Sequence, residues 1–283
     1  MFSLILCTIN RQNEIEQFID SIVSSTIKIE LIIVDQNKDN LIDDIIEKYK
    51  NLKDIVLIHV KTDKKGLSRA RNLGLNYATQ EFVAFPDDDC FYESNLLEKV
   101  SDIFAKNREI EFISVKTVDP ECNDRSLINC SSMSHKITLD IKAGCSFTYF
   151  FRNNAKFKSL KFSEEMGVGA GTPYGAGEET DFITKLVFSG AKGQYFPDVT
   201  VYHEAKEATY SKDTLKRLVS YGGGYGYYIR KNKDLIGTIR ALKLLGAPFI
   251  RLIFRSKNKN QFVSSLYFLK GFFIGLFKWT ITD

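Results

Sequence analysis

The first hundred residues alternate short apolar runs with segments whose apolar side chains recur at helical spacing. Strands are expected at residues 4–7, 31–34, 55–58 and 82–85, because each is a continuous apolar run. Helices are expected between them, over residues 15–23, 41–49 and 66–78. Continuous apolar strands joined by helices are typical of a mainly parallel sheet with helices on both faces. The pattern therefore predicts an α/β, Rossmann-type domain.

The middle of the chain is less regular. Further strands are predicted near residues 113–115, 147–151 and 199–203, and a helix over residues 178–189. Five glycines crowd the segment 167–177 that precedes this helix. So many glycines allow the backbone to approach a ligand closely and to move, so we expect a binding loop there.

The composition changes sharply near residue 211. From Lys212 to the end the chain carries fourteen basic and three acidic residues, whereas the rest is net acidic. The apolar stretches 236–254 and 262–277 contain basic residues, and the second is too short and too charged for a membrane span. These features favour helices that lie on an anionic membrane surface. The alternatives are a pair of helices packed on the rest of the protein, or a basic tail for nucleic acid.

Length and composition set wider limits. With 283 residues, 44% hydrophobic and 13% aromatic, the chain can bury a substantial core. Its five cysteines are scattered without a Cys-x-x-Cys pair, which argues against a disulfide framework or a zinc site and fits a reducing compartment. The amino terminus has no basic segment before its first strand, so we expect no signal peptide.

The strongest chemical signal is a run of three carboxylates. Asp87, Asp88 and Asp89 follow the predicted strand 82–85 and Pro86, at the carboxyl end where open α/β sheets bind ligands. In an extended segment Asp87 and Asp89 share a face. Carboxylate oxygens suit Mg²⁺ or Mn²⁺, ions that also bind diphosphates. The alternative interpretation is a solvated acidic turn.

Several short segments follow one another along the chain in a distinctive order. They are Thr8-Ile9-Asn10-Arg11, Ile32-Ile33-Val34-Asp35, Gly66-Leu67-Ser68-Arg69-Ala70-Arg71-Asn72-Leu73-Gly74, Asp87-Asp88-Asp89, Gly177-Glu178-Glu179-Thr180-Asp181, Tyr195-Phe196-Pro197-Asp198 and Val201-Tyr202-His203. Each segment is weak alone, but in this order they resemble the family 2 glycosyltransferases, which have the GT-A fold, over about residues 1–205. The resemblance is to an inverting enzyme of bacterial surface-polysaccharide synthesis.

The resemblance implies a catalytic domain over residues 1–210 and a basic, aromatic-rich helical tail over 211–283. The nucleotide-binding half would be 1–115 and the acceptor half 116–210. A divalent ion, Mn²⁺ or Mg²⁺, would bind Asp89, Asp87 and His203 and offset the charge that develops on a diphosphate leaving group. The residues implied in nucleotide-sugar binding are Thr8, Asn10, Arg11, Asp35, Gly66, Arg71, Asp87 and Asp88.

The acidic pair before the helix 178–189 implies the acid–base chemistry. An inverting transfer needs one carboxylate to take the proton of the acceptor hydroxyl. The family places this base second in the pair, which is Glu179 here in place of the commoner aspartate. Glu178 and Asp181 would then bind the acceptor. The alternative is that all three acids only complement the positive end of the helix dipole.

The predicted function is transfer of a sugar from a nucleotide-diphosphate donor, with UDP favoured, to a glycan on a polyprenyl diphosphate. The enzyme would be cytoplasmic and peripheral on the anionic inner face of the cytoplasmic membrane, without nucleic acid. A nucleotidyltransferase of sugar phosphates is the first alternative, but it normally has a glycine-rich, basic loop after its first strand, unlike residues 8–11. A non-catalytic nucleotide-sugar binding protein is the second.

Overall fold

The computed structural model describes residues 1–122, 125–126, 131–140, 144–205, 210–254 and 256–278. The chain forms two compact units. The first contains Met1–Lys65, Ala70–Lys161 and Ser189–Lys206, and the second contains Gly66–Arg69, Phe162–Phe188 and Glu207–Asp283.

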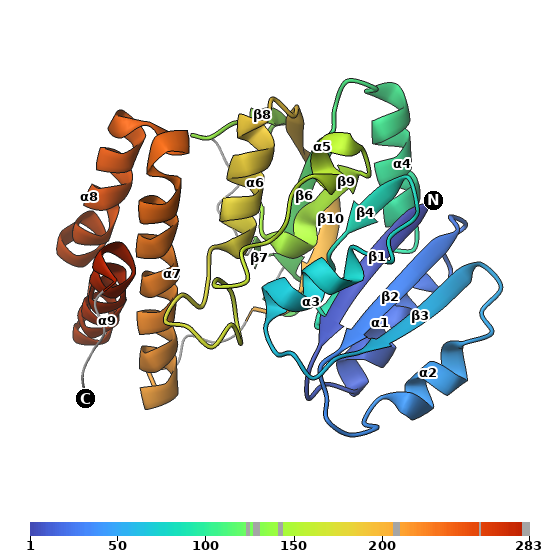
Figure 1. Cartoon of the computed structure of the whole chain (residues 1–283). Helices are drawn as coiled ribbons and strands as arrows, with labels where there is room; N and C mark the ends of the chain where they lie inside the picture. Colours follow the sequence, from blue (N-terminus) through green and yellow to red (C-terminus); the bar gives the residue numbers. More distant parts are fainter. Residues whose placement is uncertain (123–124, 127–130, 141–143, 206–209, 255, 279–283) are drawn as a thin grey trace. The chain divides into compact units, whose positions relative to one another are not determined.

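A ten-stranded sheet lies wholly within the first unit, with its main path in the order β3-β2-β1-β4-β9-β6-β10-β5 (Figure 1). Pairing is parallel between β3, β2, β1 and β4 and between β6 and β10, whereas β9 runs antiparallel to its neighbours β4 and β6. The short strands β7 and β8 pair with β6 and β10. The strands are β1 (Phe2–Thr8), β2 (Ile29–Asp35), β3 (Ile55–Lys61), β4 (Phe82–Ala84), β5 (Cys90–Tyr92), β6 (Phe112–Asp119), β7 (Arg125–Ser126), β8 (His135–Ile137), β9 (Tyr149–Arg152) and β10 (Gly193–His203).

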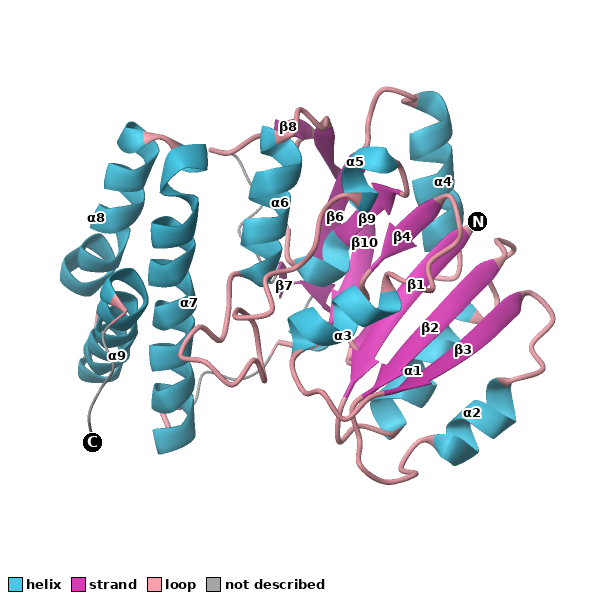
Figure 2. Cartoon of the chain, in the orientation of Figure 1, coloured by secondary structure: helices cyan, strands magenta, loops and turns pink. Residues whose placement is uncertain are grey.

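Helices cover both faces of this sheet because alternate strand residues are apolar on both sides (Figure 2). On one face Phe2, Leu4 and Leu6 belong to the same buried cluster as residues of α1, α2 and α4. On the other face Gly74 lies so close to Ile5 that a Cβ there would meet the Ile5 side chain at 2.4 Å. The helices are α1 (Asn13–Ile22), α2 (Asp43–Tyr49), α3 (Leu67–Gly74), α4 (Leu96–Lys106) and α5 (Ala155–Lys158), with short 3₁₀ turns η1 (Pro120–Cys122) and η2 (Ser146–Thr148).

The predicted α/β class and its mainly parallel sheet are confirmed. The four strands predicted in the first hundred residues are β1 to β4. The strand predicted at 199–203 is longer than expected, because β10 begins at Gly193. Its pairing with β6 shifts between Phe196 and Thr200, around Pro197. A proline at such an irregularity costs no hydrogen bond between the strands. It does interrupt the apolar run, so the sequence pattern predicts only the second half of the strand.

The second unit contains the helices α6 (Glu178–Phe188), α7 (Lys212–Ile236), α8 (Thr238–Phe254) and α9 (Lys259–Phe277). In the part of the chain that the structure describes, none of the helices combines the length and hydropathy that crossing a bilayer requires. Because α7, α8 and α9 span most of its described residues, the predicted tail is helical there, as expected.

Glycines bring the backbones of α7 and α9 into direct contact. A Cβ at Gly271 would lie 1.8 Å from the carbonyl oxygen of Val219, and one at Gly275 would lie 2.0 Å from that of Gly223. On α7, a Cβ at Gly226 would lie 2.1 Å from the carbonyl oxygen of Phe272. Gly222 and Gly226 thus face α9, whereas a Cβ at Gly223 or Gly224 would lie 2.1 Å from the carbonyl oxygen of Pro173 or Ala176.

The contact between α7 and α9 predicts that a glycine-to-alanine substitution changes stability differently at two helical positions. Gly271→Ala should destabilise the protein by about 1–3 kcal/mol or more, because the helices must separate to admit the methyl group. Gly246→Ala in α8 is the matched control, since no described residue outside its own stretch of helix lies within 4 Å of its Cβ position. It should be neutral or stabilising by up to about 1 kcal/mol. Urea unfolding of the two variants tests this, and equal midpoints would contradict the packing described.

Candidate active site

The three carboxylates lie between β4 and β5 in the first unit. Arg71 of α3, only 1% exposed, places its Nη2 3.3 Å from Oδ1 of Asp87, and its guanidinium lies over the ring of Phe85. A guanidinium so fully buried needs an acidic partner. The pair therefore fixes Asp87 at the carboxyl end of the strand.

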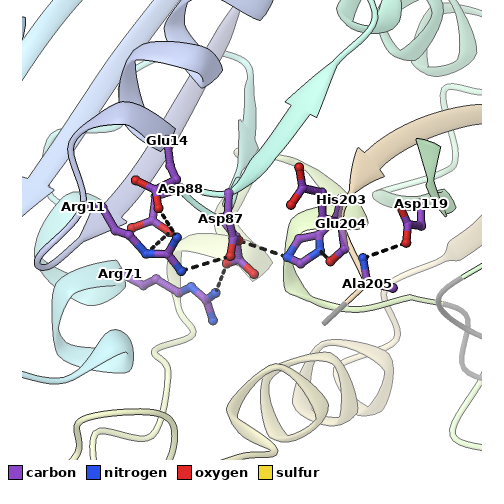
Figure 3. A network of polar contacts seen from close by, with 10 residues as sticks. Arg11, Glu14, Arg71, Asp87, Asp88, Asp119, His203, Glu204 and Ala205 are labelled. Carbon is purple, nitrogen blue, oxygen red and sulfur yellow. Dashed lines mark hydrogen bonds and ion pairs between the residues drawn. The ribbon is translucent and has the colours of Figure 1, made fainter. Parts of the chain in front are cut away.

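Asp89 lies between a guanidinium and an imidazole. Nη2 of Arg11 is 3.2 Å from Oδ2 of Asp89, and Nε2 of His203 is 3.0 Å from Oδ1. His203 ends β10, its Nδ1 lies 2.7 Å from the carbonyl oxygen of Glu204, and its ring stacks on Phe147 at 4.8 Å. In Figure 3 the two arginines approach Asp87 from the side opposite His203. The imidazole is thus fixed in position by contacts on its face and at both nitrogens.

Burial and charge shift the pKa values of two of these groups. Burial raises the pKa of Asp88 to about 6, against the hydrogen bond from the Thr8 hydroxyl (2.9 Å) and the charge of Arg11. Burial lowers the pKa of His203, but the hydrogen bond and charge of Asp89 outweigh it, so the pKa is raised overall. The shift in the pKa of Asp88 is mainly an effect of burial, whereas the shift in the pKa of His203 reflects the negative charge of Asp89, which a bound cation would offset.

Asp87, Asp89 and His203 can offer one ligand atom each, all within 4.8 Å of one another. Two carboxylate oxygens with one imidazole nitrogen suit Mn²⁺, and Mg²⁺ less well. The donor set therefore fits the divalent ion that the sequence predicts, with its ligands coming from the ends of β4 and β10.

A second set of polar residues lies where β1, β2 and β3 end. Asp35 is fully buried and accepts hydrogen bonds from the backbone and side-chain nitrogens of Asn37 at 2.9 and 2.7 Å. Asn37 in turn accepts the backbone N–H of Asn10 at 2.7 Å, and Asn10 has a positive φ of 56°. His59 places Nε2 3.1 Å from Asp35. Asp35 and Asn10, predicted to bind the nucleotide, are thus joined through Asn37.

The sequence did not point to Asn37, His59 or Phe147. His59 and Phe147 lie in or beside apolar strand segments, where they look like ordinary strand residues. Asn37 follows Asp35 by two residues, a spacing typical of an Asx turn, so it is the one that could have been found.

The second unit holds the remaining predicted site residues. Gly66, with φ of 126°, lies against Gly169 of the glycine-rich loop, and the Leu67 N–H donates to the Val168 carbonyl at 2.9 Å. Glu178 is only 6% exposed and its carboxyl group lies against Gly167. Close packing at these positions requires residues without side chains.

The three acids of α6 have different environments. Asp181 is fully buried, and its carboxylate lies 2.6 Å from Lys185 Nζ, 2.9 Å from Lys231 Nζ and 2.8 Å from the amide of Asn232. Burial raises the pKa of Asp181, but the two lysines and the amide lower it by a larger amount, so the pKa is lowered overall. Glu179 is half-buried, and among the described residues its carboxylate meets only the Thr180 hydroxyl, at 3.4 Å. Of these three carboxylates, that of Glu179 is therefore the most available for contact with a bound ligand.

Comparison with known proteins identifies the family. The family described as "Glycosyl transferase family 2" matches residues 3–166, more than half of the chain. The chain belongs to this family, so it is a glycosyltransferase by descent, as its motif order predicted. The match gives no support to a nucleotidyltransferase.

Curated relatives include a galactosyltransferase and two teichoic acid biosynthesis proteins. The Escherichia coli "UDP-Gal:alpha-D-GlcNAc-diphosphoundecaprenol beta-1,3-galactosyltransferase" is 26% identical over 75% of this chain and 70% of its own length. The Bacillus subtilis minor teichoic acid biosynthesis proteins GgaA and GgaB are 31% and 26% identical, over 39% and 59% of this chain. The chain matches only 26% of GgaA and 20% of GgaB.

Solved structures share the GT-A fold. The mannosyltransferase PcManGT of Pyrobaculum calidifontis, in complex with GDP-Man and Mn²⁺, superposes with a TM-score of 0.66 at 16% identity, over 99% of this chain and 88% of its own. TarS 1–349 of Staphylococcus aureus, in complex with UDP-GlcNAc, gives 0.62 at 18% identity, over 95% and 81%.

The cluster of Asp87, Asp89 and His203 predicts a divalent-ion site. Loss of an outer-shell partner already costs about 10–100-fold in metal affinity, so Asp89→Asn, which removes a proposed ligand, should weaken Mn²⁺ binding at least as much. Asp102→Asn is the matched control, because Asp102 is exposed on α4 and belongs to neither of the two groups of described side chains that could hold an ion. Titration of the purified protein followed by Mn²⁺ electron paramagnetic resonance measures both. Unchanged binding by the Asp89 variant would exclude this site.

Proposed function

We propose that the protein is a metal-dependent, inverting glycosyltransferase that uses a UDP-linked sugar and a lipid-linked glycan acceptor. The observation that carries the proposal is the group formed by Asp87, Asp89 and His203 at the carboxyl ends of β4 and β10. Carboxylates and an imidazole at that edge of an α/β sheet suit a cation bound to a diphosphate.

The chemistry follows from the leaving group. The acceptor oxygen attacks the anomeric carbon of the donor sugar, the bond from that carbon to the diphosphate oxygen breaks, and the nucleoside diphosphate leaves with the electron pair. A divalent ion supplies charge neutralisation on the diphosphate when bound. Arg11 and Arg71 hold the carboxylates in place and add positive charge beside them. Asp35, Asn10 and Thr8 line the strand ends that we assign to the nucleoside.

Glu179 is our candidate for the base. It begins α6 as the second acid of the pair, and its half-exposed carboxylate is able to take a proton from an acceptor hydroxyl. Glu178 is assigned to acceptor binding. Asp181, also expected to bind the acceptor, is held by Lys185, Lys231 and Asn232. We therefore propose that Asp181 acts mainly by fixing α6 to α7.

The acceptor and location are inferred from the relatives. The E. coli relative is named for a diphosphoundecaprenol-linked acceptor. Such an acceptor is anchored in a membrane, so a cytoplasmic enzyme acting on it would make peripheral contact with the anionic inner face through its basic region 211–283. In this proposal residues 1–210 form the domain that catalyses the transfer, and residues 211–283 form the domain that contacts the membrane.

A donor screen tests the function. Release of nucleoside diphosphate would be measured for UDP- and GDP-linked sugars, with Mn²⁺, with Mg²⁺ and with excess chelator. We expect turnover of a UDP-sugar that requires the ion. A protein that binds UDP-sugars but neither hydrolyses nor transfers them in any condition would instead be a binding protein.

Glu179→Gln isolates the proton transfer. The amide keeps the size of the carboxylate but does not accept the proton, so kcat should fall about 10²–10⁴-fold while the Kd for the donor changes little. Glu165→Gln in the same unit is the control, because it makes the same carboxylate-to-amide change at a residue with no proposed role in proton transfer. If Glu179→Gln kept near-normal turnover while Glu178→Gln lost it, the base would be Glu178.

Asp181→Asn should act through stability. The amide leaves Lys185 and Lys231 without a carboxylate, and because both lysines are partly exposed the cost should be about 2 kcal/mol, below that of a fully buried pair. Asp234→Asn, exposed on α7, is the control.

The stabilisation by Asp181 should depend on pH. Because the pKa of Asp181 is lowered on folding, its contribution to the free energy of unfolding is present above the ordinary carboxyl pKa and is lost as pH falls through the lowered value. The difference in unfolding free energy between wild type and variant should therefore narrow in acid. A fully stable but inactive variant would support direct acceptor binding instead.

A further inference from the structure

Helix α8 is apolar on both faces. Its inner face contributes Ala241, Leu244 and Leu245 to a buried cluster with residues of α7 and α9. Pro248 has no N–H to donate to the carbonyl of Leu244, and the hydroxyl of Tyr225 on α7 donates to that oxygen at 3.0 Å. The inner face is therefore fixed by packing and by a replacement for the missing helical hydrogen bond.

The outer face of α8 is apolar and exposed. Its large side chains recur at spacings of three and four along the helix, so they form one stripe. Their exposed fractions range from 40% to 77%. We name this the α8 stripe, and its members are Ile239, Leu242, Phe249, Ile250, Ile253 and Phe254.

The α8 stripe continues onto α9. The ring of Phe249 makes an edge contact with Phe273 at 6.1 Å, and Phe273 stacks with Phe277, which is 66% exposed. An apolar surface that extends over two helices is larger than the scattered exposed residues of ordinary surfaces, and it indicates an interaction site.

All formal charges around the stripe have one sign. The sequence holds no acidic residue between Asp234 and Asp283, whereas Lys243 and Arg251 are exposed on α8 and Lys257 and Lys259 are exposed in the segment after it. A second copy of this chain would bring like charges together across such a face, which is unfavourable. Nucleic acid would match the charge but not six exposed apolar side chains. An anionic bilayer matches both, since acyl chains take the apolar residues and headgroups take the lysines and arginine.

We propose that the α8 stripe is the surface by which the protein docks on an anionic lipid bilayer, with α8 lying in the plane of the interface. This extends the membrane contact proposed above by assigning it to α8. The sequence favours the last apolar stretch, 262–277, but α9 uses Gly271, Phe272, Ile274 and Gly275 for the interior. Removing the chain after residue 257 would therefore disrupt the helical unit rather than only the contact.

Sedimentation with lipid vesicles tests the proposal without any sugar donor, so its outcome is separate from that of the catalytic proposal. The probes are vesicles of phosphatidylcholine alone and with about one quarter phosphatidylglycerol. Wild type should bind the mixed vesicles more strongly and be released only in part by high salt, because the apolar contacts are not screened. Ile250→Ser/Ile253→Ser should lower the partition coefficient at least about tenfold.

Val56→Ser/Met133→Ser is the matched control, because these residues are 65% and 73% exposed and lie outside α8. It should bind vesicles like wild type. Circular dichroism and the unfolding midpoint establish that each variant is folded. If Ile250→Ser/Ile253→Ser does not fold, Ile239→Ser/Phe254→Ser at the two ends of the stripe replaces it.

Two results would overturn the proposal. One is equal vesicle binding by wild type and a folded stripe variant, or no binding by either. The other is gel filtration in which wild type is a dimer and the stripe variant is a monomer, since the face would then be covered by a second copy.

Discussion

The mutual repulsion of three neighbouring carboxylates is the constraint around which the first unit is arranged. Asp87, Asp88 and Asp89 lie together at one strand end, and each meets a group from a distant part of the chain: Arg71, Thr8 with Arg11, and His203. Those contacts join β1, α3 and β10 at the same edge of the sheet. Burial raises the pKa of Asp88, and the negative charges of Asp89 and Asp87 add to that shift. The same repulsion that is costly in the protein alone makes the site attractive to a cation.

Much of this arrangement could be predicted because it depends on periodicity and order. The four apolar runs of the first hundred residues give β1 to β4, and a strand end followed by acids gives the position of the site. The arginine and histidine around the acids were predicted only through resemblance to a family. Nothing in local pattern connects Arg71 with Asp87, or His203 with Asp89, because those contacts depend on the order of strands in the sheet.

What the sequence could not give depends on packing between distant helices. Asp181 has the same local setting as Glu179, at the start of one helix, yet Lys231 and Asn232 of α7 bury it while Glu179 stays partly exposed. Similarly, the last apolar stretch and α8 have comparable composition, and only the glycine contacts of α9 reveal which of them faces the interior. Such distinctions require partners more than forty residues away.

The glycine face of α7 has a consequence for the order in which the chain becomes structured. Gly222, Gly223, Gly224 and Gly226 each disfavour a helix by about 1 kcal/mol relative to alanine. The middle of α7 is therefore a poor helix by itself, and its regular form depends on the packing of Gly222 and Gly226 against α9 and of Gly223 and Gly224 against residues 173–176. During synthesis, the last residue of α7 is added about forty residues before α9 is complete. The helical unit is therefore complete only when α9 has formed, and until then the inner face of α8 has only its contacts with α7.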